Sequence, residues 1–183
     1  FKFSPDGSKR MYATYIGGWA NEQPHSMICD QQGNLTIAGR TNSDNFPTTT
    51  AKVGTGGKYD IFVCKLNPTG TALVGSIRIG GSQDDGVNIK PKYIAPNPPN
   101  QNDGAYETRR NYGDDARSEV VLDAQGNIIL VSCTQSSNFP ATSGAFQKTF
   151  AGGLQDGVIL KFTSNLSALT AASFFGSAAS DAC

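Results

Sequence analysis

Few residues of this chain are of the types that carry out catalysis, and their spacing does not form a catalytic pattern. His25 is the one histidine, and no Gly-x-Ser-x-Gly elbow accompanies it, so a Ser-His-Asp triad is not predicted. The four cysteines, at positions 29, 64, 133 and 183, include no Cys-x-x-Cys pair and so lack zinc-ligand spacing. The sequence predicts no catalytic residue, no metal and no cofactor.

Two further motifs resemble ligand-binding elements in part. Residues 54–58 (Gly-Thr-Gly-Gly-Lys) share letters with a phosphate-binding loop, but its spacing and its following helix are missing, so we interpret them as a glycine-rich connection. The pairs Asp84 with Asp85 and Asp114 with Asp115 supply carboxylate oxygens, which calcium prefers. No Asp-x-Asp-x-Asp loop with a distal Glu accompanies them. Solvated loop carboxylates are therefore the preferred interpretation, and a calcium site is the alternative.

Residues 82–118 are the most distinctive segment, because they are rich in Pro, Asn, Tyr and Arg. Long loops often carry function, and Tyr and Arg are common among residues that dominate interface energies. The segment is predicted to contact a partner chain or a glycan, and a flexible loop without such a role is the alternative. The candidate binding residues are Tyr93, Tyr106, Arg109, Arg110 and Tyr112.

Composition indicates a folded protein with many tight turns. Of the 183 residues, 38% are hydrophobic and only 16% are charged, and 21 are glycines, which permit turns that need a positive φ. The 15 basic and 15 acidic residues cancel, which argues against nucleic acid as a partner. No apolar run approaches the roughly 18 residues of a membrane helix. Cys29 and Cys64 lie in apolar runs and are predicted to be buried thiols outside disulfides.

An internal repeat decides the expected architecture. Residues 41–49 (TNSDNFPTT) recur as residues 134–142 (TQSSNFPAT), at an offset of 93. Residues 2–7 (KFSPDG) recur as residues 65–70 (KLNPTG), at an offset of 63. An insertion of 30 residues accounts for the difference. We therefore divide one domain, residues 1–183, into half a unit (1–18), a full unit (19–81), the insertion (82–118) and a second full unit (119–183).

Each full unit contains four short apolar runs separated by turn signals, which predicts two β-hairpins. Several runs, such as residues 128–131 (IILV), are apolar on both faces and so predict strands covered on both sides. Stacked four-stranded sheets of this kind are the blades of a β-propeller; a β-sandwich is the alternative. The predicted strands are residues 26–30, 35–40, 60–66, 73–79, 119–123, 128–133, 158–162 and 170–175.

Specific side chains are expected in the core. Phe46 and Phe139 should occupy equivalent buried places, each followed by a proline that ends local pairing. The strand residues expected to be buried are Leu35, Ile37, Ile61, Val63, Ile128, Leu130, Val158 and Leu160.

The motifs together resemble the SBBP repeat, a β-propeller repeat of bacterial secreted and surface proteins. The resemblance rests on residues 13–18 (ATYIGG), 30–34, 38–41, 46–49 and 60–66 (DIFVCKL), and in the second copy on 139–147 and 152–157. It covers nearly the whole chain except the insertion. Arg40 and Cys133 replace small residues of the pattern, and residues 163–166 (TSNL) replace its Pro-Asp-Gly turn.

The resemblance implies an extracellular or cell-surface bacterial protein, a non-catalytic scaffold, adhesin or binding module rather than an enzyme. A glycan-active propeller enzyme with its catalytic residues outside this chain is the alternative. Two and a half units are fewer than the four to eight blades that close a propeller. We therefore expect a fragment of a larger repeat protein, whose partners are further blades or another protein, with a glycan as a further candidate.

Overall fold

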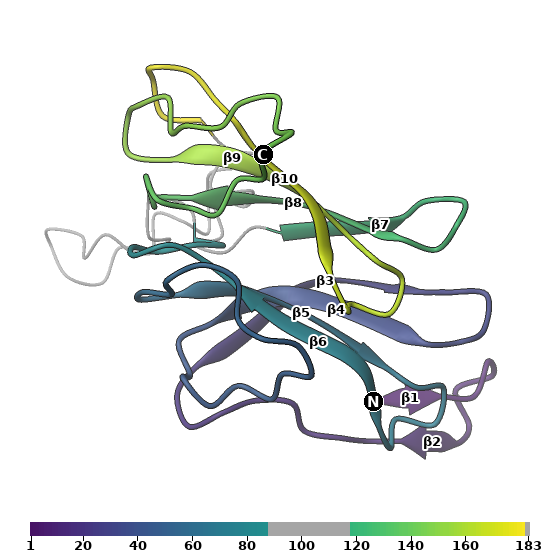
Figure 1. Ribbon diagram of the computed structural model, residues 1–183. Helices are drawn as coiled ribbons and strands as arrows, with labels where there is room; N and C mark the ends of the chain where they lie inside the picture. The colour runs from purple at the N-terminus through teal and green to yellow at the C-terminus, as the bar shows by residue number, and fades with distance from the viewer. Residues whose placement is uncertain (88–117, 182–183) are drawn as a thin grey trace, which may run out of the picture.

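The structure, a computed structural model, describes residues 1–87 and 118–181. This part contains strands and no helix, arranged in antiparallel sheets of two, four and four strands (Figure 1). The expectation of an all-β protein is confirmed. It follows that the described residues include no helix able to cross a membrane. The five candidate binding residues, Asp114, Asp115 and Cys183 lie outside the described residues.

The two larger sheets share one design, in which each strand pairs with its neighbour in the chain. The small sheet pairs β1 (Lys2–Phe3) with β2 (Arg10–Tyr12). Sheet I contains β3 (Glu22–Cys29), β4 (Leu35–Thr41), β5 (Asp60–Leu66) and β6 (Leu73–Ile79). Sheet II contains β7 (Ser118–Leu122), β8 (Ile128–Thr134), β9 (Asp156–Phe162) and β10 (Leu169–Phe175).

The first hairpin of each sheet closes on an aspartate turn. Asp30 Oδ1 accepts hydrogen bonds from the amides of Gln32, at 3.0 Å, and Asn34, at 2.8 Å. Gly33 supplies the positive φ of 82° that this turn requires. Asp123 makes the matching bonds to the amides of Gln125 and Asn127, at 3.0 and 2.8 Å. The first hairpin predicted in each full unit is therefore present.

The second hairpins reach the same turn with different residues. Gly70 has a φ of 68° at the end of the 67–70 turn, and Leu166 has a φ of 58° at the matching place. A positive φ is costly for a leucine. Leu166 is fully buried, and Thr50 Oγ1 donates to its carbonyl at 2.9 Å. Burial thus holds a turn for which glycine would be the local choice.

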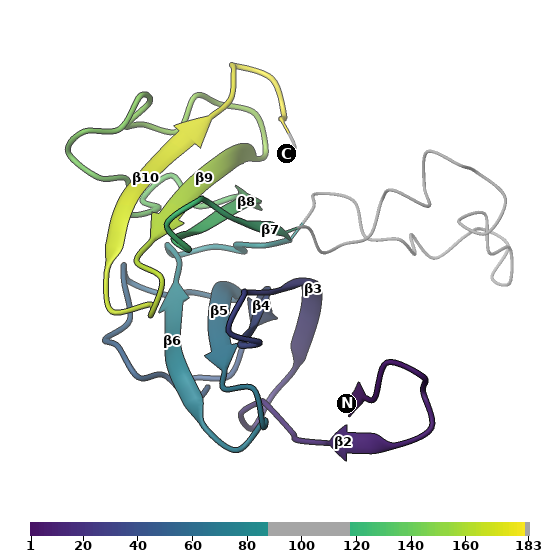
Figure 2. The ribbon, with the colours of Figure 1, turned by 90° about the vertical axis from the view of Figure 1, so that its right-hand side faces the viewer.

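The two sheets stack face to face, with β7 over β3 and β10 over β6 (Figure 2). In each sheet we call the face that carries Phe62 or Val158 the front face, and the face that carries Val63 or Ile159 the back face. The front face of sheet II packs on the back face of sheet I. The buried residues between them are Ala38, Ile61, Val63, Ile77 and Ile79 of sheet I with Val120, Ile128, Leu130, Phe139, Val158, Leu160, Phe162, Leu166, Ala172 and Phe174.

The core expectations hold for most positions. Ile61, Val63, Ile128, Leu130, Val158 and Leu160 are fully buried. Phe46 and Phe139 are buried as predicted, Phe46 with its ring centroid 4.6 Å from that of Phe62 and Phe139 with its centroid 6.1 Å from that of Phe174.

Two of the core assignments in β4 are wrong. Leu35 and Ile37 are only half-buried, whereas Thr36 and Ala38 are fully buried. The reason is that Leu35 and Ile37 lie on the front face of sheet I, and sheet II covers the back face. Cys29, across from Leu35 in β3, is exposed for the same reason, contrary to expectation. Cys64 is a buried thiol outside any disulfide, as expected.

Candidate functional site

The glycine-rich residues 54–58 form the connection between β4 and β5, as interpreted from the sequence. Gly57 N donates to Asp60 Oδ1 at 3.2 Å, and Gly56 N donates to the Gly80 carbonyl at 3.3 Å. A Cβ atom on Gly54 would collide with that carbonyl, so the loop packs directly against the backbone that follows β6. These amides are engaged within the protein and do not form a cradle for phosphate.

A buried ion pair lies at the end of β5. Arg78 Nε donates to Asp60 Oδ2 at 2.5 Å, and Arg78 Nη1 donates to the carbonyl of Ser43 at 2.7 Å. The two side chains are 7% and 1% exposed. Buried charges must be paired in this way, because an isolated one loses its hydration without compensation. The pair joins β5 and β6 to the loop that follows β4.

Asp85 is a second buried carboxylate, on the connection that leaves sheet I. Its Oδ2 accepts hydrogen bonds from Gly81 N at 2.7 Å and Ser136 Oγ at 3.1 Å, and its Oδ1 accepts one from Thr134 Oγ1. Burial, together with the charge of Asp60, raises the pKa of Asp85 to about 7 despite these donors. A Cβ atom on Gly80 would meet both carboxylates, so a glycine is required between them.

The burial of Asp85 corrects the expectation of a solvated loop carboxylate. Asp85 is fully buried, while its neighbour Asp84 is half-buried and accepts a hydrogen bond from Tyr59 N at 3.3 Å. In the described part of the chain, no three His, Cys, Asp or Glu side chains gather where a metal ion could bind. The geometry instead makes Asp85 a connector between the two sheets.

Glu22 occupies the place of Asp85 at the start of sheet I. Its Oε2 accepts from Gly18 N at 3.1 Å, and its Oε1 accepts from Thr41 Oγ1 at 2.7 Å. Burial opposes its ionisation, but hydrogen bonds from Ser43, Thr41 and Gly18 prevail and lower its pKa. Glu22 and Asp85 thus make the same contact, but Glu22 is less deeply buried, and its pKa shifts in the opposite direction.

Asp156 occupies the place of Asp60 in sheet II, since Asp60 pairs with Thr41 and Asp156 with Thr134. Phe174 stands where sheet I has Arg78, so this buried carboxylate lacks the cation. Its Oδ2 accepts from Ala151 N at 2.6 Å, and its Oδ1 has no hydrogen-bond partner in the described part of the chain. Burial raises the pKa of Asp156, with a contribution from the charge of Asp181.

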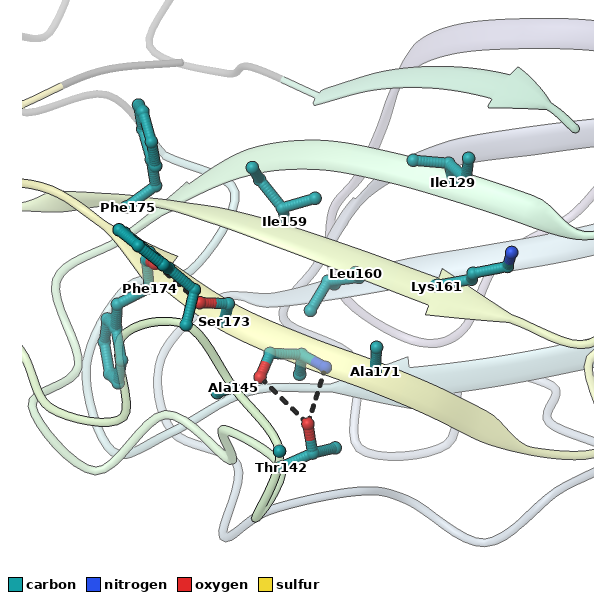
Figure 3. Close-up of a pocket in the computed structure, with 13 residues that line it drawn as sticks. Ile129, Thr142, Ala145, Ile159, Leu160, Lys161, Ala171, Ser173, Phe174 and Phe175 are labelled. Carbon is teal, nitrogen blue, oxygen red and sulfur yellow. Dashed lines mark hydrogen bonds between the residues drawn. The ribbon is translucent and has the colours of Figure 1, made fainter.

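An apolar hollow of about 480 Å³ lies on the back face of sheet II. Figure 3 shows Ile129, Ile159 and Phe175 on this face, with Lys161 at its edge. Ile159 is 39% exposed, and Phe175 and Phe146 are more exposed still. A second hollow continues from Phe146 and Phe175 to Asp181. Neither hollow is lined by Asp60 or Asp85, so the buried carboxylates are separate from the accessible surface.

Sequence reasoning singled out Asp85 but missed the connecting role of Asp85 and Glu22, and it missed the hollow. Thr41 and Thr134 lie within the repeated motif, but their partners Glu22 and Asp85 differ in type and lie outside its matched residues. The doubled Gly-Gly element at residues 17–18 and 80–81 was the available signal, because both carboxylates follow it by the same number of residues.

Comparison with known proteins adds no family to this description. No family model matches the chain, and no curated protein matches it. The functional argument therefore rests on the sheets, their contacts and their exposed faces.

Proposed function

We propose that this chain belongs to a non-catalytic β-propeller of the SBBP-repeat type, acting outside the bacterial cell as a scaffold for adhesion or binding. The observation that carries the proposal is the stacking of sheets I and II in one sense, the front face of the second on the back face of the first. Blades of a propeller stack in this sense, and every added sheet can repeat the contact.

The buried carboxylates support a structural rather than a catalytic role. Asp60 is neutralised by Arg78, and Asp85 accepts donors from Gly81, Thr134 and Ser136. A general acid or base must reach a substrate proton within hydrogen-bond distance. Both residues are at most 1% exposed, so a glycan has no path to them in this arrangement.

The binding surface of the proposal is the segment of residues 82–118, with Tyr93, Tyr106, Arg109, Arg110 and Tyr112 as the contact residues. Aromatic rings and guanidinium groups suit both a glycan and a protein partner. The stacked sheets would then act as the support that presents this segment, and catalysis would not be required for function.

Retention on immobilised bacterial polysaccharides, paired with an assay for released reducing ends, tests this function. We expect retention without release, and loss of retention in a Tyr106→Ala, Arg109→Ala, Arg110→Ala variant. Tyr15→Ala is the matched control, because Tyr15 is a fully exposed tyrosine in another part of the chain. Release of reducing ends would contradict the non-catalytic role.

A further inference from the structure

The same contact joins a connecting segment to the sheet that follows it at two places. We call the segments Gly18–Glu22 and Gly81–Asp85 the first and second arms. Each is held by a loop with the sequence Thr-x-Ser-x-Asn that follows the second strand of the next sheet. These receptor loops are Thr41–Asn45 in sheet I and Thr134–Asn138 in sheet II.

The second arm makes a full set of bonds to its receptor loop. Ser82 N donates to Asn138 Oδ1 at 2.9 Å, and Gln83 N donates to Ser136 Oγ at 2.9 Å. The Asp85 carboxylate closes the arm by accepting a hydrogen bond from Gly81 N, and it accepts another from the Thr134 hydroxyl of the loop. The threonine, the serine and the asparagine of the Thr-x-Ser-x-Asn loop are all used.

The first arm repeats this set with other residues. Trp19 N donates to Asn45 Oδ1 at 2.9 Å, and Ala20 N donates to Ser43 Oγ at 2.8 Å. Glu22 accepts from Gly18 N and Thr41 Oγ1. The backbone amides of the arm bind the loop, so the arm residues between glycine and carboxylate can vary.

A third arm is present after β10, at Ser177–Asp181. Ser177 N donates to Asp181 Oδ2 at 2.6 Å, as Gly81 N does to Asp85 Oδ2 at 2.7 Å. Asp181 N donates to the Gln155 carbonyl at 2.9 Å, as Asp85 N does to the Tyr59 carbonyl at 2.8 Å. The arm is thus already closed on its carboxylate, and no receptor loop faces it in the described residues.

The back face of sheet II lies beside this arm and is open. Register places Ile159 opposite Val131 and Ser173, as Val63 lies opposite Ala38 and Ile77 in sheet I. Val63 is fully buried under sheet II, whereas Ile159 is 39% exposed. The hollow along Ile159 and Phe175 runs on to Asp181, so the apolar face and the third arm form one continuous surface.

We infer that this surface is the docking site of a further four-stranded sheet that carries a Thr-x-Ser-x-Asn loop after its second strand. The inference rests on the proposed stacking and names its recognition element. Asp181 accepts a hydrogen bond from the threonine hydroxyl, and the amide of Ala178 binds the asparagine. The amide of Ala179, which donates to Ser177 Oγ at 3.2 Å in this structure, exchanges that partner for the serine. A second copy of this chain fits less well, because its Thr41, Ser43 and Asn45 are already bound by its own first arm.

An extended chain tests the inference: residues 1–183 followed by a second copy of residues 118–183. This junction gives the third arm the same spacing to its sheet as the first arm has. Glu119 is the register equivalent of Ser26. Three residues lie between Glu22 and Ser26, and three residues lie between Asp181 and the added copy of Glu119. We expect amide exchange at Ala178 and Ala179 to slow at least tenfold relative to the original chain, and binding of a hydrophobic dye to the Phe175 surface to fall.

Variants of the added copy separate the arm contact from apolar packing. Thr134→Val with Ser136→Ala in that copy should restore fast exchange at Ala179, because the serine that binds this amide is removed. Thr149→Val with Ser167→Ala, which changes exposed residues of the same types, should leave the slow exchange intact. A folded added copy that leaves exchange and dye binding unchanged overturns the inference.

A second extension, with residues 19–81 as the added unit, repeats the test on another sheet. If both added units stay unfolded, the surface does not support a docked sheet and the inference fails. The inference also fails if the original chain dimerises and amide exchange becomes slower at Ala178 and faster at Trp19 and Ala20. A second copy of the chain would then occupy the surface. The polysaccharide assay is independent of these results, so the proposed function is judged separately.

Discussion

Sheets I and II have the same strand order and the same register, but they differ in how much of their apolar surface is covered. Sheet I has a packed cluster on each face, one beneath sheet II and one around Phe62 and Phe46. Within residues 1–87 and 118–181, sheet II is packed on its front face alone. Ile79 is therefore fully buried, whereas Phe175, its register equivalent, is 54% exposed. What decides burial here is the neighbour that each face meets, and not the residue type.

The same contrast extends to the lysines of the back faces. Lys65 Nζ lies 2.8 Å from Asp30 Oδ2 and donates to the Ser164 carbonyl of sheet II at 2.9 Å. Lys161 Nζ lies 2.8 Å from Asp123 Oδ2, but its side chain is 43% exposed, against 6% for Lys65. Identical local ion pairs thus lie in different dielectric surroundings, so their effects on stability should differ.

The largest expected difference separates two phenylalanines of sheet II. Phe162→Ala should lower the free energy of unfolding by about 3–5 kcal/mol, because Phe162 is fully buried between the sheets and its removal leaves a cavity. Phe175→Ala should change it by less than about 1 kcal/mol, because the ring is half-exposed. Urea unfolding of both variants measures this, and equal losses would contradict the description of an open back face.

The ion pairs should differ next. Burial raises the pKa of Asp30, but hydrogen bonds from Lys65 and Asn34 outweigh it and lower the pKa to about 2. Lys65→Met should therefore lower the free energy of unfolding by about 3 kcal/mol, because it leaves Asp30 buried without its cation. Lys161→Met should cost less than about 1 kcal/mol. Adding Asp30→Asn to Lys65→Met should recover part of the loss. Comparable costs for the two lysine variants would show that sheet II does not shield Lys65.

Taken per pH unit, a smaller effect concerns the pH dependence of the two arms. The pKa of Asp85 rises from 3.8 to about 7, so between these values the folded protein binds more protons than the unfolded chain, and stability falls as pH rises. Asp85→Asn should remove this slope, which is at most ~1.4 kcal/mol per pH unit.

Glu22→Gln should act in the opposite direction. The pKa of Glu22 is lowered, so Glu22 stabilises the protein above the ordinary carboxyl pKa, and this contribution is lost as pH falls through its folded value. Thermal melts between pH 3 and pH 8 compare the two variants with the original chain. Slopes of the same sign for Asp85 and Glu22 would refute the difference in burial between the arms.

Local sequence determined the strands, the hairpins and their turns. The runs at residues 60–66 and 73–79 form β5 and β6 with the predicted bounds, because β-branched and aromatic residues flanked by turn residues favour strands whatever lies around them. Asp30 and Gly33 act within one turn, where the interacting atoms are neighbours in the chain. The motif containing Phe46 and Phe139 predicted buried rings correctly, since both occur in the same local context.

Tertiary structure decided which faces and charges are covered. Alternation in β4 separates Leu35 and Ile37 from Thr36 and Ala38, but only the position of sheet II shows that the second set is buried. The hydrogen bond between Thr134 and Asp85 joins two residues that are 49 positions apart, and no local pattern specifies such a pairing. Burial, and with it the cost of leaving a carboxylate charged, depends on atoms distant in sequence, so it emerges only when the sheets have packed.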